Sequence, residues 1–285
     1  RFIDRIGKGI RGAPRDALLA DITPPAIRGA AFGLRQSLDT VGAFVGPLLA
    51  TALMLLWAND FRAVFWVAVV PGLMAVVLLM VGIREAPPAA ARRPVNPIRR
   101  EALARLGGPY WRVVAIGAVF TLARFSEAFL VLRAQQLGVA AAWVPLVMVV
   151  MNVVYAATAY PFGKLSDTLD HRQLLALGLV VLVVADLVLA TAGGWPWLLL
   201  GVALWGVHMG LTQGLLAAMV AATAPADLRG TAYGFFNLLG GVAMLASSAM
   251  AGLLWDTLGS AYTFVAGAGF ALLTLAGLLA IRWRR

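Results

Sequence analysis

The chain has 285 residues, of which 61% are hydrophobic and 13% are charged, and its mean hydropathy is +0.87. Soluble domains are about 45–50% apolar and about 25% charged, so the composition excludes a soluble protein. The net charge of +10 would favour a nucleic-acid partner in a soluble protein, but its distribution along this chain gives it another origin.

Apolar stretches of about 20 residues, the length of a membrane-spanning helix, recur along the chain. The opening stretch, residues 1–21, is charged, and the next, Gly33–Trp57, is interrupted by Arg35 and Asp39. Seven further spans follow at Ala63–Ile83, Tyr110–Leu132, Ala140–Phe162, Gln173–Ala192, Trp195–Ala222, Thr231–Trp255 and Tyr262–Ile281. The sequence therefore predicts an all-α membrane protein with nine transmembrane helices, embedded in a lipid bilayer.

The basic residues lie almost entirely on one side of these spans. With the connectors assigned alternately to the two sides, fifteen of the 23 Lys and Arg fall on one side, two, Arg62 and Arg133, fall on the other, and the remaining six lie within the spans. Such a bias marks the cytoplasmic side. It predicts a multi-pass protein of the cell inner membrane with a cytoplasmic C-terminus, and it explains the net charge without nucleic acid.

An exposed linker rich in proline and arginine divides the chain at residues 84–108. We expect residues 1–83 to hold three helices of a first bundle and residues 109–285 to form a six-helix second bundle. The two parts also share a repeat, because "TPPAIRGAAFGL" aligns with "TAPADLRGTAYGF" so that Arg28-Gly29 falls on Arg229-Gly230. Repeats of this kind are typical of transporters built from two like halves.

The repeat also predicts what the opening stretch is. Residues 1–21 align with Val202–Ala222, an apolar span, so we expect a membrane helix there. The stretch Pro109–Gly201 has no counterpart, which predicts that a segment of the same length with three helices precedes Arg1. The chain would then hold helices four to twelve of a six-plus-six carrier.

Three stretches resemble motifs of the major facilitator superfamily. "FIDRIGKGIRGA" is similar to its fourth-helix motif, "GAFVGPLLA" to the fifth-helix motif of its drug–proton antiporters, and "GKLSDTLDHR" to its loop motif. The resemblance implies two six-helix bundles around a central site that opens to each side in turn. It also implies conformational roles for the motif residues Gly42, Gly46, Pro47, Gly163, Asp167 and Arg172.

The charges of the opening stretch share one face of a helix, about 120° wide, which holds Arg5, Lys8, Arg11 and Arg15. One interpretation is a cationic cavity wall that favours anionic substrates. The other is structural, with these residues paired to acids on preceding helices. Arg15, Asp16 and Asp21, near the end of the stretch, are predicted to close the cytoplasmic gate.

Charged residues in a bilayer are costly and are therefore paired or functional. Arg124 and Glu127 are spaced i,i+3, so Glu127 either carries a proton for coupling or forms a static ion pair. Asp39 is expected to pair with Arg35, one helical turn earlier, rather than to titrate. Asp186 stands alone in an apolar helix and is expected to be protonated or paired across helices, with a proton-linked role as a further alternative.

Further polar residues are expected to line the site: Asn152, Tyr155, His208 and Gln213. For His208 a bond between helices is the alternative. Small residues that recur at every turn of a helix, such as Gly42 and Gly46 or Ala243, Ser247 and Ala251, predict close helix packing.

No enzyme motif is found: Gly7-Lys8-Gly9 lacks the Ser or Thr of a nucleotide-binding loop, and no zinc-protease or hydrolase signature is present. Two histidines and no cysteine offer no metal site, and no cofactor is expected. The sequence predicts a monomeric secondary transporter of a small organic solute, working by proton antiport in the direction of efflux. The alternatives are a proton-coupled importer of an organic anion and a fragment that does not transport.

Overall fold

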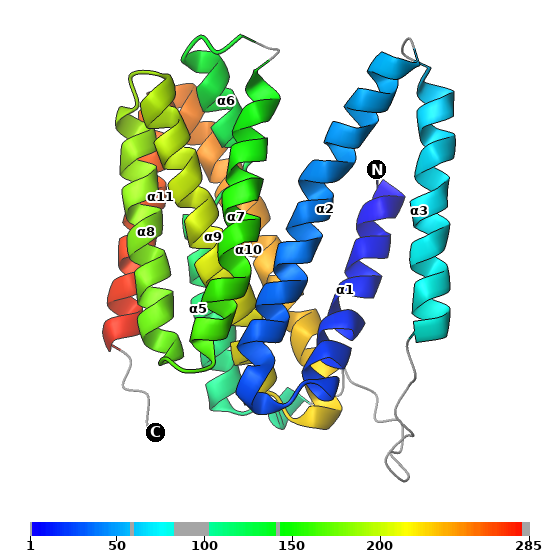
Figure 1. Cartoon of the computed structure of the whole chain (residues 1–285). Helices are drawn as coiled ribbons and strands as arrows, with labels where there is room; N and C mark the ends of the chain where they lie inside the picture. The colour runs from blue at the N-terminus through cyan, green and yellow to red at the C-terminus, as the bar shows by residue number, and fades with distance from the viewer. Residues whose placement is uncertain (1, 58–59, 83–102, 141–142, 281–285) are drawn as a thin grey trace.

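The computed structural model describes residues 2–57, 60–82, 103–140 and 143–280, without the side chains of residues 2–10 and 61. Every regular element in these residues is helical (Figure 1). The first bundle comprises α1 (Phe2–Ile22), η1 (Pro25–Ile27), α2 (Arg28–Leu56) and α3 (Phe61–Gly82). The second comprises α5 (Gly108–Ala123), α6 (Ala128–Gln136), α7 (Val144–Ser166), α8 (His171–Thr191), α9 (Trp195–Thr223), η2 (Ala226–Leu228), α10 (Arg229–Leu258) and α11 (Ser260–Ala280).

The opening stretch is a helix, as the repeat predicts, but α1 is not among the helices of the described residues that are apolar enough to count as membrane spans. In the described residues eight helices are long and apolar enough to cross a membrane, with α5 and α6 counted as one. Helix α1 has the same length as α8, 21 residues, but is more charged. The prediction of a membrane protein built from helices is confirmed.

The repeat is visible in the element boundaries. Helices α1 and α9 end at Ile22 and Thr223, which are equivalent residues in the repeat, and α2 and α10 begin at the equivalent Arg28 and Arg229. A short 3₁₀ turn stands between the helices of each pair. It is preceded by a proline with nearly the same backbone angles, φ −53° and ψ 141° in the first copy and φ −55° and ψ 142° in the second. The same sequence pattern therefore produces the same local structure twice.

The connections group at two ends of the molecule (Figure 1). The α1–α2, α7–α8 and α9–α10 connections lie at one end, at the bottom of the view, and the end of α2 and the start of α3 lie at the other. We call the first the connector end. The basic residues of these connections are segregated as the sequence predicts, because the connector end carries Arg28, Lys164, Arg172 and Arg229.

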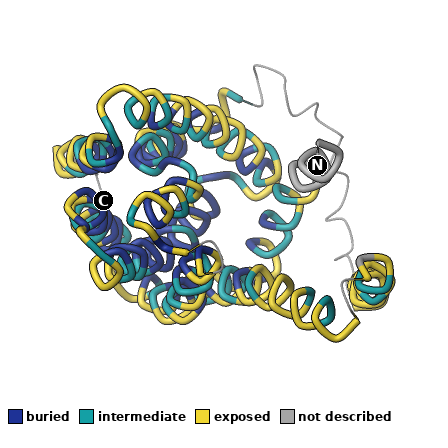
Figure 2. The backbone as a smooth tube through the Cα atoms, turned by 90° about the horizontal axis from the view of Figure 1, so that it is seen from above, coloured by how far each residue is buried: buried dark blue, intermediate teal, exposed yellow. Residues whose placement is uncertain are grey.

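The buried apolar core belongs mainly to the second bundle. Leu175, Leu179, Leu182 and Trp205, on the facing helices α8 and α9, are fully buried. In helix α3, by contrast, no residue of the most apolar 18-residue stretch is buried. The view from above shows the same difference between the helices (Figure 2). Exposed apolar side chains on a membrane-length helix are suited to contact with lipid or other helices.

Glycines bring the two bundles together where α2 crosses α7. A Cβ added to Gly33 would lie 2.4 Å from the carbonyl oxygen of Ala159, and one added to Gly163 would lie 2.8 Å from the Cα of Gly33. Close packing was predicted elsewhere on α2, at Gly42 and Gly46, and there it is wrong for the described chain: an added Cβ would meet nothing within 4 Å. The predicted small-residue face of α10 is buried, as expected, through Ala243, Ser247 and Ala251.

The continuous helix predicted for Tyr110–Leu132 is also wrong. Helix α5 ends at Ala123, and Arg124 has the extended angles φ −115° and ψ 95°. Phe125 turns into the core, with its ring centroid 5.4 Å from that of Trp205, and the Ser126 hydroxyl accepts a hydrogen bond from the Ala128 amide at the start of α6. Burial of Phe125 and this local hydrogen bond compensate for the helical bonds lost at the break.

Candidate functional site: a charged cavity between the bundles

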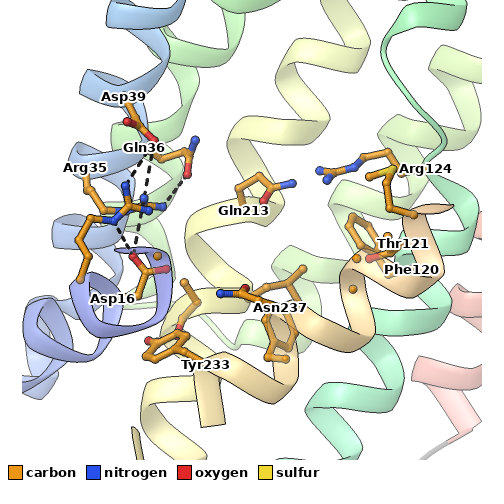
Figure 3. A pocket seen from close by; sticks show the side chains of 18 residues that line it. Asp16, Arg35, Gln36, Asp39, Phe120, Thr121, Arg124, Gln213, Tyr233 and Asn237 are labelled. Carbon is orange, nitrogen blue, oxygen red and sulfur yellow. Dashed lines mark hydrogen bonds and ion pairs between the residues drawn. The ribbon is translucent and has the colours of Figure 1, made fainter. Parts of the chain in front are cut away.

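A cavity of about 430 Å³ lies between the bundles and is lined by α1, α2, α5, α9 and α10. A neighbouring space of about 280 Å³ shares four of its lining residues, Gln36, Asp39, Arg124 and Gln213. The two spaces are therefore lobes of one site. Figure 3 shows charged and amide side chains converging on it from both bundles.

The wall contributed by the first bundle is an ionic network of four residues. Arg35 lies 3.7 Å from Asp16 and 3.8 Å from Asp39, the pair predicted from the sequence (Figure 3). Arg15 lies 3.1 Å from Asp16 and 3.8 Å from Asp39. Two cations thus face two anions, and this wall carries no net charge. Arg15 and Asp16, predicted to close a gate, are part of the cavity wall.

The wall contributed by the second bundle centres on Arg124. Its guanidinium lies against Gln213; with the Gln213 amide oxygen turned toward it, both terminal nitrogens donate to that oxygen, Nη2 at 3.0 Å. In the described chain Arg124 forms no ion pair with a carboxylate, so the predicted pair with Glu127 is absent. The break after Ala123 is the reason, since it removes the helical i,i+3 geometry. Glu127 instead lines the smaller lobe with Asn152 and Tyr155.

Several other predicted site residues lie elsewhere. Arg11 is exposed and does not line the cavity, so the cationic stripe of α1 does not form its wall as a whole. Arg5 and Lys8 lie outside the described side chains. His208 and Asp186 are fully buried outside the cavity, and His208 Nδ1 makes the alternative bond between helices, at 2.9 Å from the Gly178 carbonyl oxygen. In the described part of the chain, no three His, Asp or Glu side chains group to hold a metal ion.

Two lining residues that sequence reasoning missed are Gln36 and Asn237. They are equivalent in the repeat, and each places an amide in the cavity from the matching helix of its bundle. Their equivalence in the repeat could have identified both residues from the sequence. Phe120, Thr121 and Tyr233 carry no comparable pattern, and only the fold brings them to the site.

The bundles are joined at the connector end. Both carboxylate oxygens of Asp167 accept backbone N–H groups at the start of α2, from Gly29 at 2.6 Å and Ala30 at 2.9 Å. Asp21 of α1 pairs with Arg229 of α10. Arg172 instead stays within the second bundle, donating to the Leu279 carbonyl oxygen at 2.5 Å. The contacts of Asp167 and Asp21 therefore hold the two bundles together at this end.

The sequence model of the Major Facilitator Superfamily matches residues 1–134 and 113–285. The chain belongs to this superfamily. It is 31% identical over 278 residues to an uncharacterized MFS-type transporter of Methanocaldococcus jannaschii, covering 95% of this chain and 68% of the relative. It is also 28% identical over 259 residues to an uncharacterized protein of Mycobacterium tuberculosis, covering 89% of this chain and 63% of that protein.

A solved structure supports the fold. The human organic anion transporter MFSD10 (TETRAN) superposes with a TM-score of 0.74 at 18% identity, covering 93% of this chain and 67% of that protein. Members of the superfamily are multi-pass membrane transporters rather than enzymes, and they carry small molecules. The cavity between the two bundles is therefore the candidate site for a solute.

Proposed function

We propose that the protein is a secondary transporter that moves a small organic anion by alternating access, with Arg124 as the anion-binding group. One observation carries the proposal: Arg15 and Arg35 form ion pairs with Asp16 and Asp39, whereas Arg124 faces the cavity with an amide partner and, among the described residues, no carboxylate within ion-pair distance. A guanidinium offers a planar pair of donors to a carboxylate. Gln36, Gln213 and Asn237 add neutral hydrogen-bonding groups around the remainder of the solute.

The proposed transport of an organic anion differs from the predicted drug efflux, which depended on the motif residues Gly42, Gly46 and Pro47. A Cβ added to Gly42 or Gly46 would meet no other helix of the described chain, so their geometry adds nothing in favour of drug antiport. The neighbour MFSD10 is named for organic anions, which agrees with the proposal. We propose that the protein acts as a monomer in the inner membrane.

The test is transport by the protein expressed from its own gene and reconstituted into vesicles with an imposed pH gradient. Radiolabelled benzoate and succinate represent anions, and ethidium represents cations. We expect uptake of an acid, and Arg124→Gln should weaken it about 10- to 150-fold, since a hydrogen bond to a charged group contributes about 1.5–3 kcal/mol. The control Arg62→Gln removes the same charge from an exposed position outside the cavity. Transport of ethidium alone, or equal activity of the two variants, would contradict the proposal.

Proton coupling is proposed at Glu127, which lines the smaller lobe beside Arg124. Glu127→Gln removes the titrating group and keeps the side-chain shape. We expect exchange of labelled for unlabelled anion across the membrane to continue, while accumulation driven by the pH gradient is lost. The measurement compares the two fluxes in the same vesicles. Accumulation equal to that of the unsubstituted protein would exclude Glu127 as the coupling group.

A further inference from the structure

The interior of the second bundle holds polar atoms that the cavity does not use. Both carboxylate oxygens of Asp186, Nε1 of Trp205 and Nε2 of His208 are buried and have no hydrogen-bond partner in the described residues. All three side chains are fully buried. Asp186 is the most costly of them, because a charged carboxylate without partners is strongly disfavoured in an apolar interior.

Asp186 lies beside the break between α5 and α6. A Cβ added to Gly267 of α11 would lie 2.7 Å from Asp186 Oδ2, 3.0 Å from Phe125 Cε1 and 3.3 Å from the carbonyl oxygen of Ala123. The carboxyl group, the inward-turned phenyl ring and the last carbonyl of α5 therefore meet at this glycine. Ala123 ends its helix, so its carbonyl lacks the amide donor that a continuing helix would provide.

Among the described residues, no cation is in position to neutralise Asp186. From α9, His208 engages the Gly178 carbonyl through Nδ1. At the break, the Arg124 guanidinium points to Gln213 in the cavity. Near the end of α8, Arg133 donates to the carbonyl oxygens of Leu189 and Ala192, at 3.1 and 2.9 Å. The part of α11 that faces Asp186 contributes Gly267 and no titratable side chain. The neutral acid is the form that fits this environment.

We propose that Asp186 is a proton-binding site that controls the break in α5 and thereby positions Arg124. The bound proton neutralises the carboxyl group and lets it donate to the carbonyl of Ala123, the residue directly before Arg124. Loss of the proton leaves a charged carboxylate against Phe125, and its stabilisation requires water or a shift of the break. Asp186 is thus a positioning residue, and the link to Arg124 rests on the proposed anion site.

The proton itself is tested by infrared spectroscopy on the protein expressed from its own gene, at a series of pH values and without any anion. We expect the carbonyl band of a buried protonated acid, which shifts in heavy water and disappears in Asp186→Asn. The band should persist in Glu127→Gln. Labelling aspartate with ¹³C moves the band if it arises from aspartate, which gives an answer even where Asp186→Asn folds poorly. A carbonyl band that neither Asp186→Asn nor ¹³C-labelled aspartate changes would overturn the proposal.

A single introduced cysteine tests whether protonation of Asp186 controls the break between α5 and α6. The printed sequence has no cysteine, and Ala128, the first residue of α6, is exposed. We compare the maleimide labelling rate of Ala128→Cys in the Asp186 and Asp186→Asn backgrounds, because thiol ionisation affects both equally. The labelling rate in the Asp186 background, divided by the rate in the Asp186→Asn background, should change about 5- to 150-fold as the pH rises. This is the usual range of coupling between sites. A ratio constant with pH overturns the link, whereas a failure of Arg124→Gln to affect anion transport overturns only the proposed function.

Discussion

Replacing Gly33 by alanine is expected to separate α2 from α7 and to destabilise the packing of the two bundles. The new Cβ would lie 2.4 Å from the carbonyl oxygen of Ala159 and 3.0 Å from the Cα of Gly163. Both are backbone atoms, so no side-chain rotation relieves the overlap. Overpacking of this kind costs about 1–3 kcal/mol, and the better helix propensity of alanine, about 1 kcal/mol, offsets it only in part.

The measurement is the unfolding temperature of the purified protein in detergent, with Gly46→Ala as the control. Gly46 lies on the same helix, and an added Cβ there meets nothing within 4 Å. We expect Gly46→Ala to match or slightly exceed the unsubstituted protein, while Gly33→Ala unfolds at a lower temperature. Equal unfolding temperatures for the two variants would show that α2 and α7 do not depend on this close approach.

Replacing Asp167 by asparagine is expected to open the connector end of the cavity. The carboxylate accepts two backbone N–H groups at the start of α2, where its charge also interacts favourably with the helix dipole. Asparagine can accept only through one oxygen and carries no charge. Since a charged hydrogen bond contributes about 1.5–3 kcal/mol, the equilibrium between closed and open forms should shift about 10- to 150-fold toward opening.

Spin labels at Ala26→Cys in η1 and Ala226→Cys in η2, both exposed and on opposite bundles, report this opening as a longer distance. The control is Asp170→Asn, because Asp170 caps α8 within the second bundle by accepting from the Arg172 amide. It removes the same charge from the same loop without touching α2. If both variants give the same distances as the unsubstituted protein, the Asp167 contact does not hold this end closed.

The contrast between Arg35 and Arg124 shows how far a sequence can predict a site. Arg35 and Asp39 are on one continuous helix, so their spacing alone predicts the ion pair that forms. Arg124 and Glu127 have a similar spacing, but the helix between them breaks because Phe125 packs against Trp205 of α9, far along the chain. Local periodicity contains no information about such a distant partner.

The sequence by itself predicted most of the helices and the repeat of the two halves, because hydrophobic length and turn chemistry are local properties; the break between α5 and α6 is the exception. It also predicted a helix in the opening stretch, through the apolar counterpart of that stretch in the repeat, Val202–Ala222, and α1 spans Phe2–Ile22. Apart from the pair of Arg35 and Asp39, only the tertiary structure decided which charges are compensated. Arg15 is neutralised across two helices, Arg124 meets an amide, and Asp186 is enclosed without a partner among the described residues. Those outcomes depend on distances between helices, and distances of that kind are set by packing of glycines and aromatic rings far apart in the chain.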